Sequence, residues 1–214
     1  MKRLIVAAVV AAAGFAFADS TPVMVSLLTP VQAPSSDYDV AGLRLSLIYG
    51  QCERFKGLDI GIANRTAGDF FGFSLGGVNV VNGRVLGGQV GLVNCNSIGG
   101  TEWRNRPIGA QIGLVNYADE FCGMQWGVIN ASGSLFTGHQ CGLVNIANDI
   151  AGFQGSIFFY VPICVNIATG SVRGCQLGLI NYADEMDTGL QIGLVNIIAR
   201  GGWVPVLPIV NGNF

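Results

Sequence analysis

The sequence predicts an all-β fold: a β-solenoid of about eleven fifteen-residue coils with two inserted loops. Three observations carry this prediction: the repeat Gly-x-Gln-x-Gly-(Leu/Val/Ile)-x-Asn, its usual spacing of fifteen residues, and the alternation of apolar side chains within it. A short motif kept in step many times indicates stacked copies of one structural unit. Only 11% of the residues are charged, 50% are hydrophobic and 32 are glycine. This composition fits tightly stacked β structure and excludes a disordered chain.

Residues 1–18 are predicted to be a signal peptide. Lys2 and Arg3 precede an apolar run, residues 4–17, that is shorter than the roughly 20 residues of a membrane span. Ala16-Phe17-Ala18 matches an A-x-A cleavage site and makes Asp19 the expected mature N-terminus. We therefore expect an exported protein with no transmembrane helix in its mature chain.

Residues 19–41 are predicted to be an extended leader or cap. Pro22, Pro30 and Pro34 punctuate this segment, and prolines at such intervals favour extended and turn structure. The apolar stretch 23–28 fits a cap on the first coil, and a mobile leader fits equally well. Residues 42–214 are predicted to form a single β-repeat domain.

The repeat itself sets the coil boundaries. Its asparagines are Asn64, Asn79, Asn94, Asn116, Asn130, Asn145, Asn166, Asn181, Asn196 and Asn211. Two longer steps between them predict insertions at residues 96–106 and 151–160. The first copy, residues 42–49, has Arg44 in place of glutamine and Tyr49 in place of asparagine, and the last copy, residues 204–211, has Val206 in place of glutamine. We interpret these altered copies as the end units that a solenoid needs.

Alternation within the unit predicts which side chains face the core. The residues two and four positions before each asparagine, such as Leu114 and Ile112 before Asn116, are almost always apolar. We therefore expect these residues to share the core face with the asparagine. Gln111 and Gly113 then fall on the opposite face.

Strand direction separates the solenoid from its alternative, an antiparallel β-barrel of the outer membrane. In such a barrel neighbouring strands reverse, so the repeat should have a two-strand period near 30 residues. The observed period of fifteen favours parallel stacking. Parallel stacking also lets like amides meet in ladders. The predicted ladder residues are Gln89, Asn94, Gln111, Asn116, Gln125, Asn130, Gln140, Asn145, Gln176, Asn181, Gln191 and Asn196.

The sequence offers no catalytic, cofactor-binding or metal site. His139 is the single histidine, so it cannot support a catalytic triad beyond itself, and we expect it stacked and partly buried. The pairs 119–120 and 184–185 are acidic and read as solvated turns. The six cysteines, Cys52, Cys95, Cys122, Cys141, Cys164 and Cys175, have no C-x-x-C spacing. Both disulfides and buried free thiols remain open for them.

The predicted contact site is the first inserted loop, through Trp103, Arg104 and Arg106. Nucleic acid is excluded as a partner by charge. Without residues 1–18 the chain has nine basic and thirteen acidic residues, a net charge of about −4. No cofactor is expected, and the partners that remain are the cell envelope and further copies of the chain.

Two resemblances follow from these motifs. GLRLSLIYG at residues 42–50, GLDIGIAN at 57–64 and the serial GLQIGLVN units resemble a family of bacterial surface-repeat-containing proteins, over about residues 40–211. That resemblance implies an exported or surface location and no known catalysis. The spacing Gln-x-Gly-x-x-Asn-x-Ala, as in Gln111, Gly113, Asn116 and Ala118, is similar to the curlin repeat of extracellular amyloid fibres. It implies self-assembly.

Together these observations predict an exported, non-enzymatic structural or binding protein of the bacterial cell surface or periplasm. Two alternatives remain open: an outer-membrane pore and a self-assembling, curli-like fibre subunit.

Overall fold

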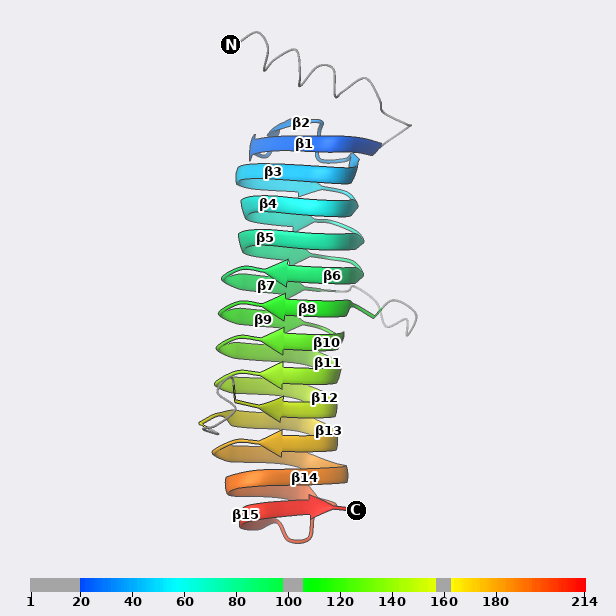
Figure 1. Ribbon diagram of the computed structural model, residues 1–214. Coiled ribbons are helices and arrows are strands. Elements are labelled where there is room, and N and C mark those ends of the chain that lie inside the picture. Colours follow the sequence, from blue (N-terminus) through cyan, green and yellow to red (C-terminus); the bar gives the residue numbers. More distant parts are fainter. Residues whose placement is uncertain (1–19, 98–105, 157–162) are drawn as a thin grey trace.

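The chain forms a rod of stacked β coils (Figure 1). The computed structural model describes residues 20–97, 106–156 and 163–214, so the predicted signal peptide lies outside the described residues. The described part contains fifteen strands and no helix. The strands are β1 (Ser20–Leu28), β2 (Val31–Ala33), β3 (Asp39–Cys52), β4 (Phe55–Thr66), β5 (Phe70–Val81), β6 (Val85–Val90), β7 (Val93–Asn96), β8 (Ile108–Ile112), β9 (Val115–Ala118), β10 (Phe121–Trp126), β11 (Ile129–Cys141), β12 (Val144–Gly155), β13 (Val165–Leu177), β14 (Ile180–Arg200) and β15 (Val206–Asn213).

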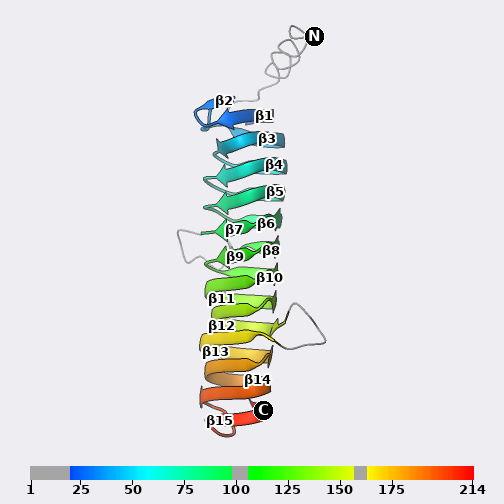
Figure 2. The same cartoon turned by 90° about the vertical axis from the view of Figure 1, so that its left-hand side faces the viewer.

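Neighbouring coils run parallel and in register from β3 to β14. Gly57 of β4 pairs with Gly72 of β5, which pairs with Gly87 of β6. In the view turned by 90°, the coils are again stacked along a single axis (Figure 2). The β-solenoid prediction of about eleven turns is therefore confirmed. The barrel alternative is wrong, because the strands are parallel and the ends of the strand order, β2 and β15, do not pair with each other.

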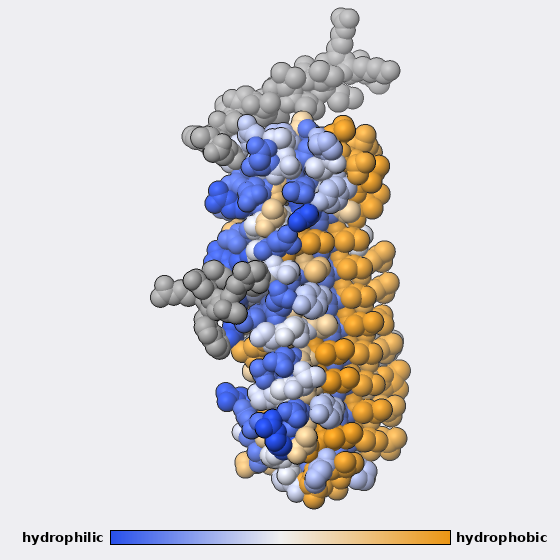
Figure 3. Space-filling model, turned by 180° about the vertical axis from the view of Figure 1, so that it is seen from behind, coloured by the Kyte–Doolittle hydropathy of each residue, from blue (hydrophilic) through white to orange (hydrophobic). Residues whose placement is uncertain are grey.

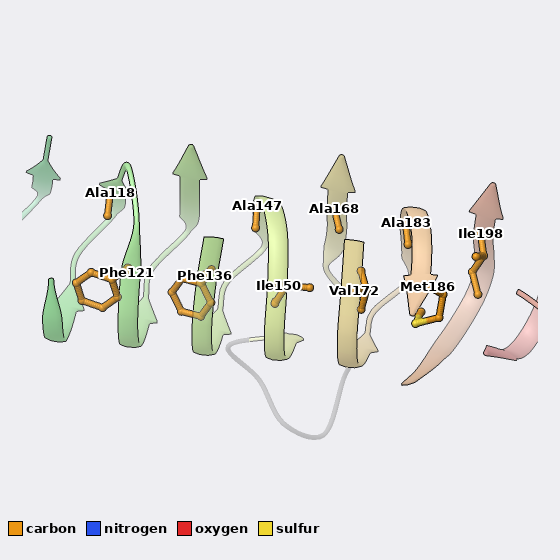
Figure 4. Packing of buried hydrophobic residues seen from close by; sticks show 10 residues of the cluster. All are labelled: Ala118, Phe121, Phe136, Ala147, Ile150, Ala168, Val172, Ala183, Met186 and Ile198. Carbon is orange, nitrogen blue, oxygen red and sulfur yellow. The ribbon is translucent and has the colours of Figure 1, made fainter. Parts of the chain in front are cut away.

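Each regular coil has a glutamine side and an asparagine side, joined at a corner formed by the motif Gly-Leu. Inward residues of the glutamine side include Phe121 and Phe136, whose rings stack at 6.1 Å between β10 and β11. Inward residues of the asparagine side include Ala118 and Ala147. Figure 4 shows this alanine column facing the column of Phe, Ile, Val and Met side chains. Small residues on one side thus make room for large ones on the other.

The predicted assignment of the core face was wrong. Gln111 and Asn116 are both fully buried, whereas Leu114 between them is 53% exposed. Alternation holds from Gln111 to Leu114, but Leu114 and Val115 follow each other at the corner with no inward residue between them. This changes the phase by one residue before Asn116. Counting back from the asparagine therefore placed every apolar residue of the glutamine side on the wrong face.

The two ends of the rod carry antiparallel strands. β1 pairs in parallel with β3, and the short β2 pairs antiparallel with β1. At the other end β15 pairs antiparallel with β14, because the chain turns back through residues 201–205. Asn211 therefore lies opposite Gln191 instead of Asn196. The asparagine column therefore ends at Asn196.

Two further expectations change at irregular coils. The register between β3 and β4 shifts after Ser46, so that Gly50, not Tyr49, lies opposite Asn64. The predicted second insertion, 151–160, begins too early. Residues 151–155 belong to β12, and Gln154 lies in register between Gln140 and Gln176. This copy keeps the glycine and glutamine that the coil requires, although its next motif residues are lost.

The first glycine of the motif forms a column with a backbone conformation that other residues rarely adopt. Gly109 has φ of 152°, and the equivalent glycine of every coil from Gly42 to Gly189 has a positive φ in the same range. A Cβ on Gly109 would lie 1.7 Å from the carbonyl oxygen of Gly87 in the coil before. The column therefore lets adjacent backbones approach at a point where no side chain fits.

Candidate functional surface

The interior of the rod is occupied by a glutamine ladder. Nε2 of Gln111 donates to Oε1 of Gln89 at 2.9 Å, and Nε2 of Gln125 donates to Oε1 of Gln111 at 2.8 Å. The same bond, at 2.7–2.8 Å, continues through Gln140, Gln154, Gln176 and Gln191. The second proton of several of these amides goes to a backbone carbonyl, as from Gln111 to Tyr117. That carbonyl fixes which end of each amide is the nitrogen.

The asparagine ladder runs in the opposite direction. Nδ2 of Asn116 donates to Oδ1 of Asn130 at 2.9 Å, toward the C-terminal end of the rod. Equivalent bonds at 2.7–3.2 Å link all the asparagines from Asn64 to Asn196. Glutamine amides donate toward the N-terminal end. The two rows of amide dipoles are therefore antiparallel and offset each other along the rod.

Near the N-terminal end a buried ion pair replaces the glutamines. Arg44 donates to the Asp59 carboxylate through Nε at 2.8 Å and Nη2 at 2.6 Å, and both side chains are about 1% exposed. Arg44 also donates to the Arg65 carbonyl and lies 2.9 Å from Cys52 Sγ. Burial raises the pKa of the Cys52 thiol to about 11. This cluster fills the core with satisfied polar groups and has no opening to a substrate.

The turns opposite the Gly-Leu corner form a polar edge held by ion pairs between coils. Arg54 pairs with Asp39 at 2.8 Å, and Arg84 pairs with Asp69 at 3.7 Å. Arg173 and Arg200 pair with acids of β14 at 2.6–3.3 Å. The predicted acidic turns are thus matched by arginines. Tyr117 donates to Asp119 at 2.6 Å, and this bond raises the pKa of Tyr117 to about 12.

The corner side of the rod carries an apolar surface, which we call the apolar face. It consists of outward residues on either side of the second motif glycine, or of Ser46 in the first coil, each 36–66% exposed; the coil corners at Gly142 and Gly155 contribute none. Figure 3 shows hydrophobic residues gathered along this edge for the length of the rod. The residues of the apolar face are Leu45, Leu47, Ile60, Ile62, Leu75, Leu92, Ile112, Leu114, Trp126, Val128, Leu179, Ile192 and Leu194.

A groove of about 840 Å³ runs within the apolar face, along the rod axis. Its walls include Leu75, Leu92 and Leu114, and its floor is the backbone of the second motif glycines. These glycines are required by the asparagine ladder beneath them. A Cβ on Gly113 would lie 2.8 Å from Nδ2 of Asn94 and 2.4 Å from the Gly91 carbonyl oxygen. The ladder inside the rod therefore creates the groove outside it.

The predicted contact loop is only partly described. Trp103 and Arg104 lie outside the described residues, and Arg106 is 3.4 Å from a carboxylate oxygen of Glu120. His139 is exposed rather than partly buried, since its position points outward, with its ring 6.1 Å from that of Phe153. All six cysteines are free. Cys52, Cys141 and Cys164 are buried and the others half-buried.

No family model, curated protein or solved structure matches this chain. The resemblances to surface-repeat proteins and to curlin therefore stay predictions. Residues 20–97, 106–156 and 163–214 contain no cluster of three His, Cys, Asp or Glu able to hold a metal ion. The same ranges include no helical segment with the length and hydropathy of a membrane span. The apolar face is not predicted from the sequence, because counting back from the asparagine through the change of phase at the coil corner places its residues on the core side.

Proposed function

We propose that this chain is an exported, non-enzymatic structural protein of the bacterial cell surface or periplasm, a repeat scaffold that binds through its apolar face. The carrying observation is the extent of that face, which covers the coils from Leu45 to Val128 and returns from Leu179 to Leu194. Soluble monomers rarely expose a contiguous apolar patch larger than about 300–600 Å². Larger patches mark interaction surfaces.

The use of the inward side chains supports the scaffold role. Within the ladders, glutamines bond to glutamines and asparagines to asparagines from coil to coil, Arg44 pairs with Asp59, and several acids of the polar edge pair with arginine. Such ladders stiffen a rod and hold the outward side chains at a fixed spacing near 4.8 Å per coil. A rigid row of equally spaced apolar ridges suits binding. The predicted signal peptide supplies the export.

The test is made in the bacterium that encodes the chain. We expect the mature protein to begin at Asp19 and to be found in the periplasmic or surface fraction. Cross-linking of intact cells should place it in a complex larger than one chain. The double variant L92Q/L114Q on the apolar face should lose that complex. Cytoplasmic retention of the wild type, or a complex that the variant leaves intact, would contradict the proposal.

The matched control is the double variant L86Q/I108Q. Leu86 and Ile108 come from the same two coils and are 49% and 50% exposed, against 59% and 53% for Leu92 and Leu114. Ile108 precedes Ile112 of the apolar face by four residues, roughly 13 Å along the strand, and Leu86 has the same position in its own coil. The chemical change is the same, so this control should keep the complex.

A further inference from the structure

We infer that the partner on the apolar face is a second copy of this chain, packed face to face along the rod to give a closed dimer. This inference rests on the proposed function, since it assigns the occupant of the same face. Its first support is periodicity. The side chains that line the groove repeat once per coil, and another copy is the partner whose side chains necessarily have the same spacing.

The shape of the face is self-complementary. The row containing Leu92 and Leu114 stands 53–59% exposed beside the groove floored by Gly91 and Gly113. Over residues 61–128, the ridge of one copy therefore has a groove in the other copy to enter. Interdigitation of this kind is how dry interfaces form between paired sheets.

The size of the face agrees with what a dimer needs. A stable interface of standard size uses about 20–30 residues on each side. The thirteen residues of the apolar face, with the glycines between them, supply about that number. A face-to-face pair is isologous: each copy covers the apolar face of the other. No free apolar face then remains, so assembly stops at two chains.

Charge disfavours a lipid surface as the occupant. Six of the eight described lysine and arginine residues are engaged in ion pairs, which leaves Lys56 and Arg65. Surface-lying amphipathic elements bind anionic lipid through rows of basic residues beside their apolar side. The apolar face has no such row in the described residues. Its flanks carry glycine and further aliphatic side chains instead.

The ends of the rod disfavour growth into fibres. β15 is an antiparallel addition to β14 at one end, and at the other end the antiparallel β2 covers residues 25–28 of β1, so a further coil could not continue the parallel register at these strands. At the C-terminal end the glutamine ladder stops at Gln191. Asn211 of β15 lies opposite Gln191, and Oε1 of Gln191 accepts no hydrogen bond from it. These end strands interrupt the end-to-end stacking of one rod on another, whereas they do not obstruct the pairing of two rods side by side.

The experiment is sedimentation velocity on purified residues 19–214 without detergent, over a wide concentration range. We expect the wild type at twice the mass of the chain. The L92Q/L114Q variant should weaken the dimer at least tenfold, and the L86Q/I108Q control less than threefold, with unchanged circular dichroism for both. A wild type that stays monomeric at high concentration overturns the inference. Equal weakening by the two double variants overturns it as well.

Two additional outcomes identify other occupants. Flotation of monomeric protein with phosphatidylcholine vesicles, lost in L92Q/L114Q, would assign the face to lipid and overturn the dimer. Sedimenting particles much larger than two chains, or fibres, would overturn the closed pair. If the purified chain is monomeric while the complex in cells still depends on the face, only this inference fails. If the cellular complex is also absent, the proposed function fails too.

Discussion

At the residue scale, the position of a glutamine in the ladder determines how many bonds it makes. Oε1 of Gln125 accepts from Gln140, and its Nε2 donates to Gln111. Gln89 begins the ladder, and its Nε2 has no partner. Both side chains are fully buried, so removing either one leaves a cavity of the same origin. The difference between the losses of unfolding free energy on replacing Gln125 and Gln89 therefore reports the hydrogen bonds alone.

We expect Gln125→Ala to destabilise the rod by about 1–2 kcal/mol more than Gln89→Ala. Gln125→Ala leaves Oε1 of Gln111 without a donor, and a buried unsatisfied group costs about 1–3 kcal/mol. Urea unfolding followed by circular dichroism measures both variants. Equal losses of unfolding free energy would show that the ladder bonds add nothing beyond packing.

The column of positive-φ glycines leads to a second expectation. Gly109→Ala combines an unfavourable φ of 152° with a Cβ 1.7 Å from the Gly87 carbonyl oxygen. Backbone strain alone is of the order of 1–3 kcal/mol, and the clash adds to it. We expect a loss above about 3 kcal/mol or a failure to fold. Gly133→Ala is the control, because its Cβ first meets the movable Tyr117 hydroxyl at 3.1 Å. A thermal melt of both variants provides the comparison.

The buried Cys52 thiol makes stability depend on alkaline pH. Burial raises its pKa from an ordinary value of 9.0 to about 11. Between these values the folded chain binds more protons than the unfolded chain, so this stabilisation is fully present below pH 9 and lost as the pH rises through 11. The effect is on the order of 2 kcal/mol for a shift of this size. Urea midpoints at pH 8 and pH 10.5 should differ less for Cys52→Ala than for the wild type, and identical differences would refute the assignment.

At the element scale, the coil corner marks how far the sequence could be used to predict the structure. The repeat predicted parallel coils because its period is a local property of the chain. Which side chains face inward depends on where the in–out alternation is interrupted. In the sequence Leu114 and Val115 are both apolar, so nothing there marks the interruption, and the pattern indicates alternation that continues through the corner. Polar Gln111 in the core is predictable only if the amide ladder is weighed above hydropathy. The groove follows from that corner and was therefore missed.

The strand pair β3–β4 shows how an ion pair substitutes for a ladder step. Asp59→Ala would leave Arg44 buried without its carboxylate, and breaking such a pair costs about 3–5 kcal/mol. The double variant R44Q/D59Q restores the motif residue in both coils and removes both charges together. We expect it to lie within about 1 kcal/mol of the wild type. Denaturant unfolding of the single and double variants tests this, and a double variant as unstable as Asp59→Ala would rule it out.

At the scale of the whole molecule, each coil contacts only the coils before and after it, so length should be adjustable in units of the repeat. Deleting residues 131–145 joins Asn130 to Ile146 and brings Gln125 beside Gln154 and Asn130 beside Asn166. Phe121 then meets Ile150 in the core, where it now meets Phe136. Every inward column is preserved.

We therefore expect the deletion of 131–145 to fold into a rod shorter by about 4.8 Å, one strand spacing, with a lower unfolding midpoint. Small-angle scattering measures the length and circular dichroism the strand content. Deleting the ten residues 132–141 is the control, because it places apolar side chains opposite the ladder amides and should prevent folding of the C-terminal coils. The two deletions differ in register, which the first keeps and the second breaks. If both deletions fold, or neither does, stability comes from something other than matched columns, and the ladders would be a consequence of the fold instead of its cause.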